Sequence, residues 1–172
     1  MSNKRVRLCL VGLVLSLAVT GCANKGNRQA MGDSKTYAAN TYGTGEMDAF
    51  DGSNLTSEQR NLLAQRKFLF GFDRYDLNNN DYESLTAHAN YLKEHPNHKI
   101  RVEGHTDEQG SREYNIGLGE RRGNAVSHFL ASQGVPSNQY AVVSYGKEKP
   151  EIMGADEGSY AQNRRAVIVY EQ

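Results

Sequence analysis

Residues 99–134 read KIRVEGHTDEQGSREYNIGLGERRGNAVSHFLASQG. Its first six residues alternate between polar and apolar side chains, which predicts a strand with Ile100 and Val102 facing inward. Residues 112–133 have apolar side chains at helical spacing, and Gly134 is typical of a helix end. The stretch therefore predicts a strand and a long helix joined by a short polar loop.

Further strands and helices are expected on both sides of this unit. Strands that alternate with helices indicate a sheet with helices packed on it. We therefore predict an α+β fold, a two-layer α/β sandwich with a mixed sheet and the order β-α-β-α-β-α-β. The remaining elements are a helix at 56–65, a strand at 67–73, a helix at 78–96, strands at 140–146 and 166–171, and a short helix near 159–163.

Side-chain patterns within these elements make local predictions. Phe68, Phe70 and Phe72 alternate, so we expect them on one face of the strand at 67–73. Thr56 is a candidate N-cap for the first helix. In the helix at 78–96, Asn80 and Glu83 have the spacing of a capping box. Its expected apolar stripe consists of Tyr82, Leu85, Ala89 and Leu92.

The N-terminus has the layout of a secretory signal. Three cations, Lys4, Arg5 and Arg7, lie at its start, and an uncharged apolar run ends at Val19. This run is shorter than the roughly 20 apolar residues that a membrane-spanning helix needs. The sequence therefore predicts a signal peptide over residues 1–21, with a spanning helix as the alternative.

Residues 19–22, VTGC, resemble the lipobox of bacterial lipoproteins. The resemblance implies that Cys22 becomes the first mature residue and that its sulfur carries a diacylglycerol. Cys9 lies inside the predicted signal, so Cys22 has no cysteine left with which to form an internal disulfide. Acyl chains on Cys22 would insert into outer-membrane lipid, because each buried CH₂ contributes ~0.8 kcal/mol. Ala23 replaces the Asp typical of inner-membrane retention, which implies an outer-membrane protein facing the periplasm.

The segment after the signal is expected to be a flexible tether. Residues 22–55 are rich in Gly, Asn, Ser and Thr, so they cannot bury enough apolar surface to offset the entropy of ordering. Residues 56–172 remain for one domain. Removal of residues 1–21 leaves 17 basic against 20 acidic side chains, a formal charge of −3. Because nucleic-acid-binding domains are basic, no nucleic acid is expected as a partner.

The predicted loop and long helix could bring charged residues close together. Arg122 lies four residues after Leu118, on the inward stripe of the helix, whereas Arg121 points elsewhere. Asn115 lies two turns before Arg122, and Asp107 is in the preceding loop, so these residues could line one pocket. A carboxylate binds an ammonium group and a guanidinium binds a carboxylate, which suits a free amino-acid end. The alternative is that Asp107 and Arg122 simply pair with each other.

Three stretches of the chain carry a resemblance to a known family. They are FGFDRYDL at 70–77, VEGHTDEQGSREYNIGLGERRGNAV at 102–126 and QNRRAVI at 162–168. They resemble the OmpA-like peptidoglycan-binding domain family, and the second stretch matches the family pattern TD-x2-G…YN-x2-L-x3-R. Gly119 and Gly123 stand where small residues such as Ser and Ala are usual in that family, and a helical glycine costs ~1 kcal/mol against Ala.

The resemblance implies non-covalent binding of the peptidoglycan stem peptide at its meso-diaminopimelate. By position, Asp107 would bind the ammonium group of this ligand and Arg122 its carboxylate. His105 would be a structural neighbour. The other residues that the resemblance assigns to the pocket or its mouth are Asn115, Leu118, Phe72, Asp73 and Arg164.

The resemblance also implies partners and a cellular role. Lipid-anchored members of the family partner TolB and other Tol components, and they support envelope integrity and outer-membrane constriction during cell division. Nothing in the residues themselves indicates a TolB contact. We therefore expect an outer-membrane lipoprotein that links the membrane to peptidoglycan.

His105 and Asp107 leave a periplasmic metal-dependent or wall-degrading hydrolase as the alternative. A catalytic zinc site needs about three protein ligands, and this pair supplies two. The other histidines are scattered, and no HExxH, CxxC or GxSxG spacing occurs in the mature chain. We therefore expect no enzyme activity, no catalytic residue, no metal and no cofactor.

Overall fold

The computed structural model describes residues 54–171. The predicted signal peptide, the lipidation site Cys22 and all but the end of the predicted tether lie outside the described residues. None of the helices within residues 54–171 has both the length and the apolar character needed to cross a membrane.

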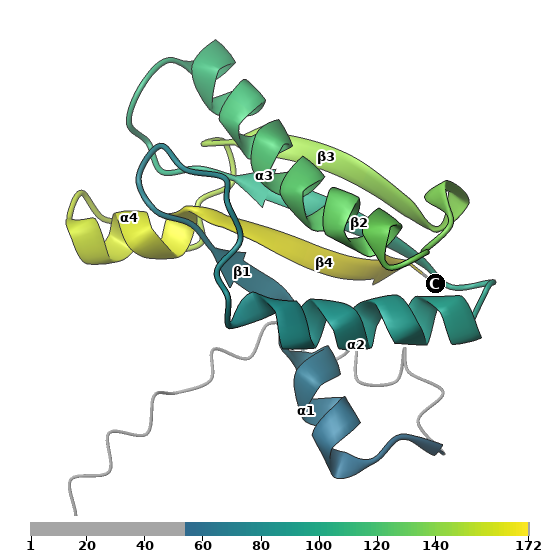
Figure 1. Ribbon diagram of the computed structural model, residues 1–172. Coiled ribbons are helices and arrows are strands. Elements are labelled where there is room, and N and C mark those ends of the chain that lie inside the picture. The colour runs from purple at the N-terminus through teal and green to yellow at the C-terminus, as the bar shows by residue number, and fades with distance from the viewer. Residues whose placement is uncertain (1–53, 172) are drawn as a thin grey trace, which may run out of the picture. The chain divides into compact units, whose positions relative to one another are not determined.

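Eight principal helices and strands make up this part of the chain, with a single 3-10 turn before the third strand. The predicted alternation of strands and helices is confirmed, with a short helix ahead of it (Figure 1). In chain order they are α1 (Ser57–Ala64), β1 (Lys67–Leu69), α2 (Asp81–Glu94), β2 (Lys99–His105), α3 (Arg112–Ser132), β3 (Tyr140–Gly146), α4 (Glu157–Asn163) and β4 (Arg165–Glu171).

The four strands form one mixed sheet in the order β1-β4-β2-β3. The last strand in the chain, β4, lies between β1 and β2 and runs antiparallel to both. β3 lies at the edge, parallel to β2. The α+β class and the mixed sheet predicted from the sequence are therefore confirmed.

Helices α2 and α3 cover one face of the sheet, which gives the two predicted layers (Figure 1). Ile100 and Val102 alternate inward along β2 as predicted, and both are buried. From the helices, the core receives the expected apolar stripe of α2 except Tyr82, which is 40% exposed and packs on Phe129. The remaining core side chains include Phe68, Phe70, Val126, Leu130, Ala166, Ile168 and Tyr170.

Glycines let α3 lie unusually close to the sheet. A methyl group added to Gly104 of β2 would overlap the backbone carbonyl oxygen of Gly119 in α3. A methyl group on Gly119 would meet the Ser144 hydroxyl, and one on Gly123 would lie 2.6 Å from Cγ1 of Val142. The two helical glycines that depart from the family pattern thus face β3 at this close approach.

The strand predicted at 67–73 is shorter than expected. β1 ends at Leu69, and Phe72 is 60% exposed although Phe68 and Phe70 are buried. The backbone turns at Asp73, whose φ of 54° lies in the left-handed region that a strand does not use. Phe72 therefore leaves the core face, and the prediction that the three phenylalanines share that face was wrong.

The caps of the helices were predicted with mixed success. Thr56 caps α1 as predicted, and it forms a capping box with Gln59. Asn80, in contrast, has a helical ψ of −15° and makes no side-chain cap hydrogen bond, so the predicted capping box at α2 was wrong. The carboxylate of Asp81 instead accepts a hydrogen bond from the backbone N–H of Asn78 at 3.2 Å, in the turn that precedes α2.

Candidate functional site

A pocket of about 280 Å³ lies where the β1–α2 loop, the β2–α3 loop, the first half of α3 and the end of α4 meet. We call it the Asp107 pocket. All seven residues that the sequence analysis assigned to a ligand line it, namely Phe72, Asp73, Asp107, Asn115, Leu118, Arg122 and Arg164.

Arg122 reaches this pocket from inside the core. It is fully buried on the inward face of α3, as its spacing predicts. Three of the five N–H groups of its guanidinium donate to backbone carbonyls. The other two, one on each terminal nitrogen, are left for a ligand. Burial lowers the pKa of Arg122 to about 10, so it remains a cation at neutral pH. The accepting carbonyls are those of Arg74 at 2.8 Å, His105 at 2.8 Å and Gly71 at 3.1 Å.

Asp107 and Arg122 do not pair with each other, so the alternative that they form a simple ion pair was wrong. The partner of Asp107 is Arg164, whose Nη1 donates to Oδ2 at 3.2 Å. The other oxygen, Oδ1, accepts from the backbone N–H of Gln109 at 3.2 Å. The pocket therefore contains a buried carboxylate and, separately, a buried guanidinium whose protein partners are carbonyls.

Arg164 is shared between two acids. Besides Asp107, its guanidinium bonds the carboxylate of Glu157 in α4 and the carbonyl oxygen of Phe70. Burial by itself lowers the pKa of Arg164, but the bonds to Glu157 and Asp107 outweigh burial and raise its pKa. The end of α4 thus supplies a fixed positive charge to the wall of the pocket.

Asn115 and Leu118 lie on the first turns of α3, below the loop that contains Asp107. The side-chain amide of Asn115 donates to the carbonyl oxygens of Gln109 at 2.8 Å and Ser111 at 3.0 Å. These bonds fix the loop, which turns at Gly110 with a φ of 92°. Ser111 then caps α3 by accepting from the backbone N–H of Tyr114.

Phe72 and Asp73 lie at the mouth, as the resemblance implied. The carboxylate of Asp73 accepts a hydrogen bond from the hydroxyl of Tyr114, which also lines the pocket. This bond joins the β1–α2 loop to α3 across the opening. With Phe72 60% and Tyr114 46% exposed, the mouth presents two aromatic rings to solvent.

Sequence reasoning missed three lining residues, Gln109, Gly110 and Tyr114. Tyr114 stands directly before Asn115 in the YN pair of the motif, so its position was an available signal. Gly110 could have been found as a glycine in a tight loop before a helix. No signal in the sequence identifies Gln109.

His105 lies outside the pocket. Its ring stacks on Tyr145 at 5.4 Å, on the sheet face opposite α3, and neither ring nitrogen makes a well-formed hydrogen bond. Burial, followed by the positive charges of Arg165 and Lys149, lowers the pKa of His105 to about 3. Because Asp107 points into the pocket, the two residues do not share a site. Within residues 54–171, no three His, Cys, Asp or Glu side chains are grouped to hold a metal ion.

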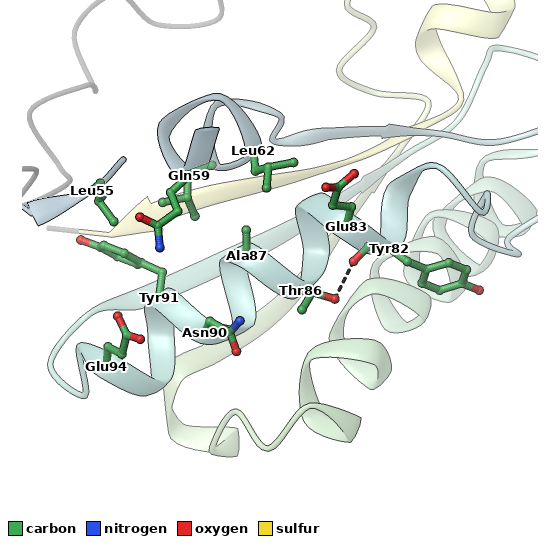
Figure 2. A pocket seen from close by; sticks show the side chains of 11 residues that line it. Leu55, Gln59, Leu62, Tyr82, Glu83, Thr86, Ala87, Asn90, Tyr91 and Glu94 are labelled. Atoms are coloured by element: carbon green, nitrogen blue, oxygen red, sulfur yellow. Dashed lines mark hydrogen bonds between the residues drawn. The ribbon is translucent and has the colours of Figure 1, made fainter. Parts of the chain in front are cut away.

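A larger hollow of about 570 Å³ lies between α1 and α2 (Figure 2). Its charged lining side chains are Glu83 and Glu94, and no cation lines it. Figure 2 also shows the Thr86 hydroxyl bonded to the carbonyl oxygen of Tyr82, at 2.6 Å, so this polar group is already satisfied. The hollow therefore lacks the two opposite charges that a zwitterionic ligand requires.

Comparisons with known proteins agree with this geometry. Residues 69–164, which include all seven candidate residues, match the OmpA family. The chain is 41% identical to the peptidoglycan-associated lipoprotein of Haemophilus influenzae, over 98% of this chain and 99% of the relative. It is 44% identical to the protein of that name from Pseudomonas aeruginosa, over 91% and 92% respectively.

Solved structures give the same result. The crystal structure of the peptidoglycan-associated lipoprotein from Burkholderia pseudomallei is 47% identical and superposes with a TM-score of 0.63, covering 64% of this chain and 93% of that one. The C-terminal domain of Helicobacter pylori MotB has a TM-score of 0.57 at 23% identity, covering 62% and 84%, and this likeness concerns the fold alone. By sequence and by fold, the chain belongs to the OmpA family and, within it, to the peptidoglycan-associated lipoproteins.

Proposed function

We propose that this protein binds peptidoglycan non-covalently at the diaminopimelate residue of the stem peptide and links the outer membrane to the cell wall. The observation that supports this most directly is the pairing pattern in the Asp107 pocket. A buried carboxylate and a buried guanidinium line one cavity without neutralising each other. The family of the chain supports the same ligand, since its relatives are named for their association with peptidoglycan.

In the proposed complex, the free zwitterionic end of diaminopimelate enters the pocket. Its ammonium group lies against Asp107, and its carboxylate accepts from the two N–H groups that Arg122 does not use on backbone carbonyls. Asn115 holds the loop of Asp107 in place, and Leu118 supplies an apolar wall for the methylene chain of the ligand. Both charged groups are pre-organised by the protein, so little conformational entropy is lost on binding.

The predicted lipid anchor would determine where this binding occurs. Acyl chains on Cys22 would hold the protein in the outer membrane, with its domain in the periplasm. A tether of about 33 residues spans roughly 30 Å on average as a coil. The anchor would thus confine the pocket to a thin layer next to the wall and raise its effective concentration there, so modest affinity suffices. Mass spectrometry of the mature N-terminus tests the anchor, and an unmodified Cys22 would refute it.

The proposal includes TolB and other Tol-Pal components as partners, with a role in envelope integrity and in constriction of the outer membrane during division. Its support is the similarity to peptidoglycan-associated lipoproteins along almost the whole chain. Co-purification of the mature protein with TolB tests this part. Absence of TolB from the purified protein would contradict this partner without contradicting peptidoglycan binding.

The hydrolase alternative has less support. It requires His105 and Asp107 to act together, and they point to different parts of the molecule. The hydrolase would release soluble fragments from purified peptidoglycan, whereas a binding protein leaves its mass unchanged.

Co-sedimentation with purified peptidoglycan tests the main proposal. The mature chain is used with Cys22→Ala, which removes the acyl chains and leaves residues 54–171 unchanged. Asp107→Asn keeps the size of the side chain and removes its charge, so affinity should fall about 10- to 100-fold, as expected for a hydrogen bond between charged groups. Asp76→Asn is the matched control, because this carboxylate is exposed, pairs with Arg74 and does not line the pocket.

Free meso-diaminopimelate should displace the protein from the wall. Unchanged sedimentation of Asp107→Asn, or no displacement by diaminopimelate, would overturn the assignment of the pocket.

A further inference from the structure

Arg121, the neighbour of the buried Arg122, occupies a defined place on the surface of α3. Its guanidinium carbon lies 5.7 Å from the ring centre of Tyr75 and 5.9 Å from that of Tyr114. The tyrosines are 51% and 46% exposed, so the guanidinium rests against two rings at the surface. We call these three residues the Arg121 ledge.

The ledge is fixed to the rim of the Asp107 pocket. Tyr114 lines the pocket and bonds Asp73 at its mouth. Tyr75 belongs to the β1–α2 loop, and Arg122 holds that loop through the carbonyl oxygens of Gly71 and Arg74. The ledge and the pocket therefore share their supports, and a ligand in the pocket would extend past Tyr114 towards Arg121.

Arg121 differs from other exposed arginines near it in having no acidic partner. Arg74 pairs with Asp76 at 2.8 Å, and Arg112, on the same helix, pairs with Glu148 at 3.0 Å. No carboxylate in residues 54–171 forms a salt bridge with Arg121. A guanidinium oriented by two aromatic rings and not neutralised by an acid is suited to an external anion.

We propose that Arg121 binds a second carboxylate of the same wall ligand, on the residue next to the diaminopimelate whose zwitterionic end occupies the pocket. The inference rests on the proposed function and identifies which chemical feature of the stem peptide the protein distinguishes. The zwitterionic end of diaminopimelate lies at the end of its side chain, and the neighbouring residue is joined through its γ-carboxyl, so the α-carboxylate of that neighbour is about ten covalent bonds from the group in the pocket. Such a chain is longer than the 5.9 Å between the Arg121 guanidinium carbon and the ring centre of Tyr114, so the carboxylate can reach Arg121.

The expected contribution is modest and sensitive to salt. The ledge is open to water, so the charge pair should change affinity about two- to fivefold. Salt at ~1 M reduces the Debye length to ~3 Å and should remove most of this difference. The two tyrosines reduce the entropy that Arg121 loses on binding, because they already restrict its side chain.

Isothermal titration calorimetry with three probes tests the inference on the mature chain with Cys22→Ala. The probes are meso-diaminopimelate, γ-D-glutamyl-meso-diaminopimelate with a free α-carboxylate, and the same dipeptide with that carboxylate amidated. The unsubstituted protein should bind the carboxylate dipeptide about two- to fivefold more tightly than the amide at low salt. Arg121→Gln should abolish this preference and leave the affinity for diaminopimelate within about twofold.

Two further variants separate charge from packing. Arg121→Lys should retain part of the preference, because it keeps the positive charge. Arg112→Gln, an exposed arginine of the same helix that has its own acidic partner, should leave the preference intact. Thermal unfolding of each variant shows whether the fold is retained.

The outcomes distinguish the two proposals. If the unsubstituted protein binds diaminopimelate but binds the carboxylate and amide dipeptides equally, the role of Arg121 is overturned and the pocket stands. An equal loss for all three probes in Arg121→Gln means that Arg121 only supports the pocket, and this also overturns the inference. If no probe binds the unsubstituted protein, both proposals fail.

Discussion

The guanidinium of Arg164 lies 3.2 Å from the carboxylate of Asp107, and both side chains are almost completely buried. The residue proposed to bind the ammonium group of the ligand therefore already has a cationic partner inside the protein. Arg164 also bonds Glu157 and the carbonyl oxygen of Phe70, so it joins α4 and the start of the β1–α2 loop to the β2–α3 loop. The bonds of Arg164 at the pocket therefore contribute to the stability of the fold as well as to the binding site.

Arg164→Gln should lower the free energy of unfolding by about 3 kcal/mol, because it leaves the buried charge of Asp107 without its partner. Urea denaturation measures this loss. The matched control is Arg101→Gln on the open face of the sheet, where Arg101 pairs with Glu103 and Glu171 and is 33% exposed. The control should cost under about 1 kcal/mol. Equal effects of the two substitutions would contradict a structural role for the Arg164–Asp107 pair.

Arg122→Lys should also destabilise the protein, by about 2 kcal/mol. A lysine has one nitrogen, which cannot donate to the separate carbonyls of Gly71, Arg74 and His105, and a buried acceptor without a donor costs ~1–3 kcal/mol. Urea denaturation is again the measurement, with Arg121→Lys as the control that should change little. An unchanged midpoint for Arg122→Lys would show that the three carbonyl bonds contribute no stability.

Arg122 both supports the fold and is proposed to bind the ligand, which affects the choice of binding experiments. A loss of peptidoglycan binding by Arg122 variants would combine a lost ligand contact with a loosened β1–α2 loop. The substitution Asp107→Asn also removes one charge partner of Arg164, so its unfolding must be measured beside its binding. It disturbs the fold less than an Arg122 variant, because the amide can still accept from the backbone N–H of Gln109 and Arg164 keeps Glu157.

Gly104→Ala should cost about 3 kcal/mol or more, because the new methyl group would collide with the backbone of Gly119 and push α3 off the sheet. Thermal unfolding reports the effect. The control is Gly117→Ala in α3, where the added methyl group would lie 3.6 Å from its nearest neighbour, the side chain of Arg121. Because alanine favours a helix more than glycine does, this variant should be more stable by up to ~1 kcal/mol. Two substitutions of the same size are therefore expected to act in opposite directions.

His88 should make stability depend on pH. In the fully buried ring, Nε2 lies 3.1 Å from the carbonyl oxygen of Gln65, so it carries the proton, and Nδ1 lies 2.8 Å from the hydroxyl of Tyr170. Burial lowers the pKa of His88 to about 4, whereas an unfolded histidine has a pKa of ~6.5. The unfolded state therefore binds more protons between these values. Stability is full above pH ~6.5 and falls as the pH decreases towards 4.

Between pH 7 and 5 this difference amounts to about 2 kcal/mol. Urea denaturation at several pH values should show a shallower slope in His88→Leu, whatever the absolute stability of that variant. His128→Asn, which changes an exposed histidine, should retain the original slope. Identical slopes in the His88 variant and the unsubstituted protein would contradict this account.

Elements with a long regular pattern were predictable from the sequence. The inward position of Arg122 followed from its spacing to Leu118, because helical geometry is local. The early end of β1 was not predictable, because the loop from Gly71 to Arg74 is held by hydrogen bonds from Arg122, which is distant in the sequence. The alternation of phenylalanines gave no information about that distant donor.

The residues that line the pocket were predictable from the sequence, but the pairing of their charges was not. The family motifs named seven residues that the structure brings together. The pairing of Asp107 was not predictable, because Arg164 reaches it from the far end of the chain, whereas Arg122 was nearer in sequence and of the same charge. Spacing along a helix can place a side chain on a face, but it cannot rank two cations that arrive from different elements.

The position of β4 has a consequence for the order in which the sheet can form. The seven residues Arg165–Glu171 are the last strand in sequence and a central strand of the sheet, bonded on both edges. Without this strand, β1 has no partner in the sheet and β2 lacks one of its two. The sheet therefore closes only when segments about 100 residues apart in sequence meet, so its strands are expected to form together in one cooperative step.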